Sequence, residues 1–141
     1  RLNDNGSNVF VVISDGEMGE GQVWEALAAA EKYKLGNLTA IIDQNGYQQT
    51  GATQDVLDLG SFEEKISAFG WYTQTIEGND QAAVVEALEN AAKVTDRPKA
   101  IISKTKKGYG ILPVLEETGD VNYHGKPLSP ELAEKALAFL A

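Results

Sequence analysis

Apolar residues recur along the chain at two spacings, one typical of buried strands and the other of helices. Runs or alternations of apolar residues predict strands over residues 8–14, 38–43, 71–76 and 99–104. Apolar residues three and four positions apart predict helices over 22–35, 61–69, 80–94 and 129–140. Strands that alternate with helices in this way predict an α/β fold, a parallel sheet with helices on both faces.

Residues at the ends of these segments support the boundaries. Gly36 and Asn37 form a helix stop, Ser61 with Glu64 forms a capping box, and Ser129-Pro130 opens the last helix. Ligands of parallel sheets bind beyond the carboxyl ends of the strands. The loops expected at that edge are 14–21, 43–51 and 104–127.

Composition narrows the classes of function. The chain has 141 residues, 43% of them hydrophobic, which suits one globular domain. Its net charge of -9 argues against nucleic acid or an anionic membrane as a partner. The sequence has no cysteine, no signal peptide and no apolar run long enough to span a bilayer, so we expect a cytoplasmic protein.

The loop after the first strand is acidic where a phosphate site would be expected. It holds Asp15, Glu17 and Glu20 but no Lys or Arg, although free N–H groups at such a turn favour an anion. Asn45 follows the second strand, 45 − 15 = 30 residues after Asp15. One helical crossover would bring these two side chains together, and their oxygens suit magnesium or calcium. The loop therefore predicts a metal that in turn holds a phosphate.

The residues around these two positions resemble a known motif. Ser14-Asp15-Gly16, followed about thirty residues later by Asn45-Gly46, resembles the thiamine-diphosphate motif. Residues 20–26 (EGQVWEA), 45–51 (NGYQQTG) and 123–128 (YHGKPL) resemble transketolase in particular. The resemblance extends from about Val9 to the C-terminus, and it implies a partial thiamine-diphosphate-binding fold.

The resemblance implies a set of cofactor contacts. Asp15 and Asn45 would ligate magnesium through side-chain oxygens and Tyr47 through its carbonyl, with calcium or manganese as alternative ions. Gly16 would present its N–H to the diphosphate. Ser14 would also contact the cofactor; it replaces the family's usual glycine and would tighten the loop or add a hydroxyl contact.

Three further residues are implied by the same resemblance. His124 would lie beside the diphosphate and the substrate, where it would donate a hydrogen bond or move a proton as a catalytic residue. Glu20 matches a position near the cofactor that communicates across a subunit contact. Lys104, with Thr105, matches a strand-end segment beside the active site.

The resemblance also implies missing parts. Residues 1–141 would form part of a diphosphate-binding domain whose upstream segment is encoded separately or trimmed away. The cofactor-binding site would be completed by a pyrimidine-binding domain or a C-terminal transketolase subunit, in a homodimer or heterotetramer. The reaction implied is transfer of a two-carbon ketol unit between sugar phosphates.

Other interpretations remain open. A 2-oxo acid dehydrogenase or a deoxyxylulose phosphate synthase would use the same cofactor, although Asp43-Gln44-Asn45-Gly46 and the His-Gly segment favour transketolase. A receiver-type signalling module would use Asp43 and Lys104. A catalytically silent assembly piece would keep the fold alone. Taken singly, Asp-Gly and Asn-Gly are ordinary turn dipeptides, and His124 would be a solvated loop residue.

Overall fold

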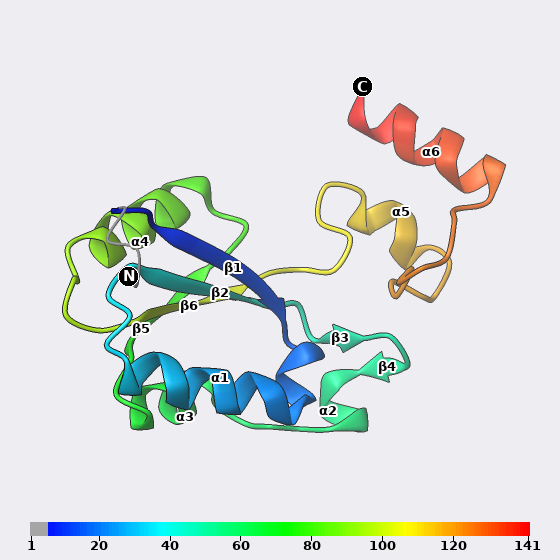
Figure 1. Cartoon of the computed structure of the whole chain (residues 1–141). Coiled ribbons are helices and arrows are strands. Elements are labelled where there is room, and N and C mark those ends of the chain that lie inside the picture. The colour runs from blue at the N-terminus through cyan, green and yellow to red at the C-terminus, as the bar shows by residue number, and fades with distance from the viewer. Residues whose placement is uncertain (1–5) are drawn as a thin grey trace.

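Four parallel strands form the central sheet of the computed structural model, which describes residues 6–141 (Figure 1). Their order is β1-β2-β6-β5, so the last strand in the chain lies inside the sheet. The strands are β1 (Val9–Ser14), β2 (Leu38–Gln44), β5 (Tyr72–Glu77) and β6 (Lys99–Lys104). All four predicted strands are present, and the predicted α/β class is confirmed.

Helices cover both faces of the sheet, as predicted. α1 (Gly21–Lys32) and α3 (Phe62–Ala68) lie on one face, and α4 (Gln81–Ala92) lies on the other (Figure 1). Successive residues of β6 point to opposite faces, so Ile102 packs in the cluster with α1 and α3 whereas Ile101 packs with α4. None of the helices described within residues 6–141 is long and apolar enough to cross a membrane.

The predicted helix starts are built by side-chain caps. Ser61 Oγ accepts the N–H of Glu64 at 3.2 Å, and Ser129 Oγ accepts the N–H of Leu132 at 3.3 Å. Asp80 Oδ1 accepts the N–H of Ala82 at 2.9 Å. These bonds satisfy N–H groups that have no partner inside the first helical turn, which is why the capping residues locate the starts so well.

Several short elements were not predicted. The loop before α1 contains the 3-10 helix η1 (Glu17–Gly19), and the loop after β2 forms the hairpin β3 (Tyr47–Gln48) and β4 (Gly51–Ala52). The remaining ones are α2 (Thr53–Val56) and α5 (Leu112–Glu116). Each has five residues or fewer, too few to establish a period in the sequence.

The C-terminal residues form a separate, small apolar cluster beyond the carboxyl edge of the sheet. α6 (Pro130–Leu140) packs against α5, and Val114, Leu115, Leu132 and Ala136 are buried between them. In Figure 1 this pair of helices stands apart from the sheet, at the end of the long connection after β6. The segment 107–128 therefore passes over the edge where the site was expected.

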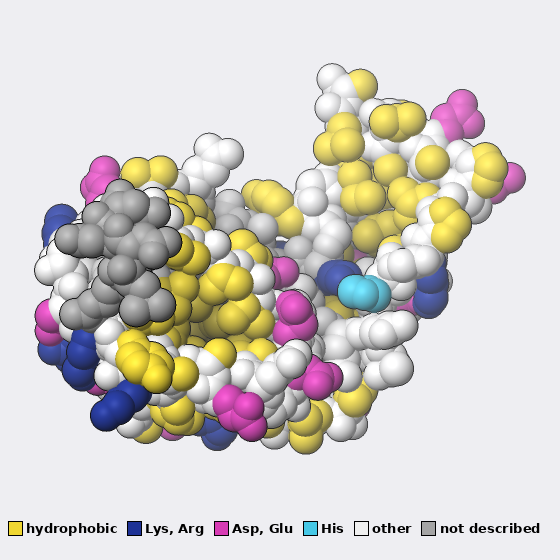
Figure 2. Space-filling view, viewed as in Figure 1, with side chains coloured by type: hydrophobic (Ala, Val, Ile, Leu, Met, Phe, Trp, Pro, Cys, Tyr) yellow, Lys and Arg dark blue, Asp and Glu magenta, His cyan; other side chains and the backbone are white. Residues whose placement is uncertain are grey.

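The prediction that β1 is buried was wrong for the described residues. β1 is an edge strand, and Phe10 and Val12 are 59% and 67% exposed because α4 covers the other end of the sheet. Figure 2 shows yellow apolar side chains gathered over this part of the molecule. The apolar run located the strand correctly. Such a run shows that a strand can be buried, but it does not show that the residues covering it belong to the same chain.

We expect the chain to self-associate through this edge, because an unpaired apolar strand recruits other chains. Val12→Lys should shift the sedimentation profile towards monomer with little change in melting temperature. Val85→Lys is the matched control, since Val85 is 55% exposed but belongs to α4 and not to β1. A parent chain that sediments as monomer at high concentration would contradict the prediction.

Candidate functional site

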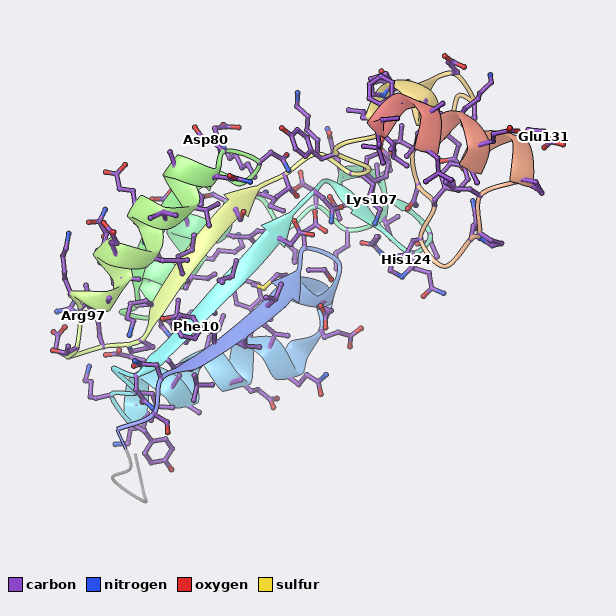
Figure 3. The ribbon with its side chains drawn as sticks, turned by 90° about the horizontal axis from the view of Figure 1, so that it is seen from above. Phe10, Asp80, Arg97, Lys107, His124 and Glu131 are labelled. Carbon is purple, nitrogen blue, oxygen red and sulfur yellow. The ribbon has the colours of Figure 1, made fainter. Side chains whose placement is uncertain are left out.

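Three loops at the carboxyl edge of the sheet enclose a cavity of about 440 Å³. They are the loops after β1, β2 and β6, the three that the sequence placed at this edge. Figure 3 shows Lys107 and His124 there, beyond the ends of the strands. The cavity is lined by Ser14, Gly16, Glu17, Glu20, Asp43, Asn45, Tyr47, Gln48, Gln49, Lys107 and His124.

Asp15 stands in the chain between two cavity-lining residues, Ser14 and Gly16, and is only 4% exposed. The parallel pairing of Ser14 with Asp43 brings the end of β1 to the end of β2, and the Asp15 N–H donates to the Asp43 carbonyl at 3.1 Å. Asp15 Oδ2 accepts the Gly46 N–H at 2.7 Å. Among the described residues, its buried Oδ1 has no hydrogen-bond partner. One oxygen thus fixes the carboxylate, and the other is left for a ligand.

The electrostatic setting of Asp15 is costly for an isolated carboxylate. Burial raises its pKa above the ordinary value of 3.8. The N–H groups of Gly46 and Gly16 act in the opposite direction, Asp43 raises the pKa further, and Lys107 lowers it. A divalent cation at Oδ1 would offset the cost of this buried charge.

Two glycines let the loops approach this closely. A Cβ on Gly16 would lie 2.8 Å from the Cβ of Gln48, so the first loop fits against the β3–β4 hairpin only without a side chain. Gly46 has φ of 81°, a conformation that favours glycine, and this aims its N–H at Asp15. The Asp-Gly and Asn-Gly dipeptides thus serve the site as well as the turns.

Asn45 is oriented by neighbours on both sides. Its Nδ2 donates to Asp43 Oδ2 at 2.9 Å, and its Oδ1 accepts the Tyr47 N–H at 3.0 Å. Thr105 Oγ1 donates to the other Asp43 oxygen at 2.5 Å. Asp43 therefore joins β2 to the end of β6 and fixes the amide of Asn45. This role of Asp43 was not predicted, although its place two residues before Asn45 was a usable signal.

Ser14 bonds within its own loop. Its N–H and hydroxyl donate to Glu17 Oε2 at 2.8 and 2.9 Å, and its Oγ accepts the Glu17 N–H at 3.2 Å. These bonds lower the pKa of Glu17. Of the two effects weighed for this serine, tightening of the loop is the one that the geometry supports.

The structure brings most of the predicted residues together. Glu20, the N-cap of α1, lines the cavity with Tyr47 and His124, while Lys104 is exposed at the end of β6 and does not line it. Lys107 does line it, and it was missed as a ligand contact because it stands among three lysines in a loop that has the composition of a solvated segment. Among the cavity-lining residues, Lys107 supplies the one lysine or arginine charge.

The donors suit a metal that keeps external ligands. Within residues 6–141, no three His, Cys, Asp or Glu side chains cluster as a metal site. The available oxygens are instead one carboxylate, one amide and a backbone carbonyl, around Asp15, Asn45 and Tyr47. Magnesium accepts such an incomplete set because waters and phosphate oxygens complete its octahedron.

Comparison with known proteins identifies the family. The family model described as "Transketolase, thiamine diphosphate binding domain" matches residues 3–138. The chain belongs to the transketolase family, in its thiamine diphosphate binding domain. This membership removes the receiver-type module from the alternatives.

The curated relatives are longer proteins. Transketolase-like protein 2 of Mus musculus is 43% identical over 126 residues, which are 89% of this chain and 20% of that protein. The 6-deoxy-6-sulfo-D-fructose transketolase subunit SqwG of Clostridium sp. (strain MSTE9) is 35% identical over 134 residues, 95% of this chain and 48% of that subunit. The chain thus spans about a fifth of the first relative and about half of the second.

Solved structures agree on the fold. Transketolase from Leishmania mexicana superposes with a TM-score of 0.69 at 20% identity, covering 94% of this chain and 23% of that one. A transketolase complex with sedoheptulose-7-phosphate from Pichia stipitis gives 0.69 at 23% identity, covering 95% and 23%. The parallel sheet and its helices are therefore those of the transketolase fold.

We expect Asp15→Asn to melt a few degrees higher than the parent at pH 7 without ligand. Because the folded pKa is raised, the folded chain binds more protons than the unfolded chain between pH 3.8 and that pKa. Stability is thus lost as pH rises above 3.8 through the raised pKa, so the cost is larger at pH 7 than below pH 4. The substituted amide keeps an oxygen for the Gly46 N–H.

Thermal unfolding followed by circular dichroism at pH 7 and below pH 4 tests this expectation, with Asp55→Asn, an exposed aspartate on α2, as control. The difference from the parent should shrink at the lower pH. A lower melting temperature for Asp15→Asn at pH 7 would show that the carboxylate is stabilising as it stands.

Proposed function

We propose that this chain is the metal- and diphosphate-holding part of a transketolase that moves a two-carbon ketol unit from a ketose phosphate to an aldose phosphate. The observation that carries the proposal is the buried Asp15 Oδ1, which has no partner among the described residues, while Asp15 Oδ2 accepts the N–H of Gly46, the residue after the oriented Asn45. Sugar phosphates as substrates agree with the Pichia stipitis relative, a transketolase in complex with sedoheptulose-7-phosphate.

In this proposal Asp15 and Asn45 hold magnesium through side-chain oxygens and Tyr47 through its carbonyl, with calcium or manganese as alternative ions. Gly16 offers its N–H to the diphosphate, since no side chain blocks the approach. Lys107 adds a positive charge to a cavity that contains Glu17, Glu20 and Asp43. When bound, thiamine diphosphate supplies the nucleophilic carbon and accepts the electrons released when the ketose carbon–carbon bond breaks.

His124 would act on the substrate side of the same cavity. It is exposed and lines the cavity, and an imidazole there would donate a hydrogen bond or move a proton. Glu20 at the start of α1 would contact a neighbouring subunit. Ser14 and Lys104 would act less directly, one by shaping the loop and the other from the strand end.

The active enzyme in this proposal is an assembly. The cavity is formed by three loops on one edge of the sheet, and a pyrimidine-binding domain or a C-terminal transketolase subunit would close it, in a homodimer or heterotetramer. The Clostridium relative is named as a transketolase subunit, which supports a split arrangement. A cysteine-free chain agrees with a cytoplasmic location. A deoxyxylulose phosphate synthase or a 2-oxo acid dehydrogenase component is the alternative with the same cofactor.

Calorimetric titration of thiamine diphosphate into the chain tests the proposal, with and without magnesium, and with a candidate partner domain. We expect binding that requires magnesium and strengthens with the partner. Asp15→Asn should abolish the magnesium-dependent binding of thiamine diphosphate, because it removes the ionised ligand. Asp55→Asn should bind like the parent. Equal heats with and without magnesium, or no binding in any combination, would refute the metal–diphosphate site and favour the assembly piece.

His124→Ala should lower turnover in the reconstituted complex by about 100-fold, with little change in thiamine diphosphate affinity. His124→Asn separates two roles, because an amide still donates a hydrogen bond but does not move a proton. A steady-state assay of ketol transfer gives turnover, and calorimetry gives the affinity. Parent-like turnover in His124→Ala would return His124 to an ordinary loop residue.

A further inference from the structure

One hydrogen bond crosses the site between segments that are far apart in the sequence. Asn122 Nδ2 donates to the carbonyl oxygen of Gln48 at 3.0 Å, over a separation of 74 residues. Gln48 belongs to the β3–β4 hairpin beside the expected metal ligands, and Asn122 lies two residues before His124. The bond thus joins the turn that carries the histidine to the loop that would carry the metal.

The Gln48 carbonyl is a firm anchor. Gln48 packs so closely on Gly16 that an added Cβ there would lie 2.8 Å from its own Cβ. The N–H of its neighbour Tyr47 donates to Asn45 Oδ1 at 3.0 Å. The N–H of Gly46, one residue earlier, donates to Asp15 Oδ2. A group that is hydrogen-bonded to Gln48 therefore keeps a fixed position relative to the loop 14–21 after β1.

The Asn122 side chain stabilises this contact through its Nδ2 donor. Its Oδ1 is buried and has no hydrogen-bond partner among the described residues, which is unfavourable for an amide. A purely space-filling side chain would avoid that cost. The backbone N–H of Asn122 is engaged separately, with Asp120 Oδ1 at 2.8 Å. The bond to Gln48 is thus the favourable interaction that the amide itself supplies.

Between Asn122 and His124 the chain has little freedom. Tyr123 packs in the cluster of α5 and α6, its N–H donates to the Val121 carbonyl at 3.1 Å, and its carbonyl accepts the Lys126 N–H at 3.2 Å. Lys126 also pairs with Asp120 at 3.3 Å. This turn is internally braced, so the place where it is anchored decides where the His124 ring lies.

We propose that Asn122 is a positioning residue, which sets His124 over the cavity by holding its turn to the Gln48 carbonyl. The assignment of a role to His124 rests on the proposed function, whereas the docking of its turn does not. Asn122 itself is half-buried and does not line the cavity, so it acts through His124 and not on the substrate.

The composition of the chain gives a direct readout of this docking. His124 is the single histidine, so its imidazole protons are identified at once in a proton NMR spectrum, and the chain has no cysteine. Thr50→Cys therefore places a single nitroxide label on the exposed turn between β3 and β4. Paramagnetic broadening of the His124 signals then reports how close its turn stays to the hairpin.

The test compares Asn122→Asp with Asn90→Asp, both in the Thr50→Cys background. Asn122→Asp keeps the shape but removes the donor, and it places a carboxylate against the Gln48 carbonyl. Asn90→Asp makes the same chemical change on α4, where Asn90 bonds to Lys93. Asn122→Ala is the second variant, and it removes the donor without adding charge.

We expect the docked-to-undocked ratio to fall about five- to thirty-fold in Asn122→Asp and to fall in Asn122→Ala, with broadening of the His124 signals decreasing as the docked population decreases. Asn90→Asp should match the parent, and the melting temperature of the sheet should not move, because Asn122 belongs to none of the three apolar clusters. Undiminished broadening in both Asn122 variants would overturn the proposal. The measurement uses neither magnesium nor thiamine diphosphate, so a failed titration would remove the proposed function without altering this result.

Discussion

The carboxylate of Asp15, buried where β1 ends, is the constraint on which the site depends. Its place follows from the register of β1 on β2. Ser14, the last residue of β1, pairs with Asp43, and the N–H of Asp15 donates to the Asp43 carbonyl. The bond from Gly46 then pulls the Asn45 turn over the carboxylate, and that turn leads into the β3–β4 hairpin. Sheet register, turn chemistry and ligand geometry are thus linked through one side chain.

The charge of this edge explains why the loop is acidic. Glu17 accepts two hydrogen bonds from Ser14, and Asp43 accepts bonds from Asn45 and Thr105, so these acids serve as structural acceptors. Asp15 is different, since one of its oxygens has no partner among the described residues. In the proposed function, a cation bound at this oxygen would offset the stability that the buried carboxylate costs the empty chain.

Much of the arrangement was predictable from sequence because it depends on local rules. The apolar periods located the four strands, the caps at Ser61 and Ser129 located helix starts, and the Asp15–Asn45 spacing located the edge. The role of Asn122 could not be found in this way, because it depends on a contact with Gln48 over 74 residues. The exposure of Phe10 was missed for a related reason, since composition does not reveal which neighbours a chain brings with it.

The position of β6 has a consequence for how the molecule is made. β6 lies between β2 and β5 although it is the last strand in the chain, so those two strands have no common neighbour until residue 104 has left the ribosome. Parallel pairing across such separations forms slowly, since the connecting loops must close first. Thr105, Lys107 and His124 all follow β6, and the cavity is therefore completed after the sheet. A nascent chain carries an open β2 edge from residue 44 until residue 104 has been made, and this interval is when that edge is most exposed to wrong pairing.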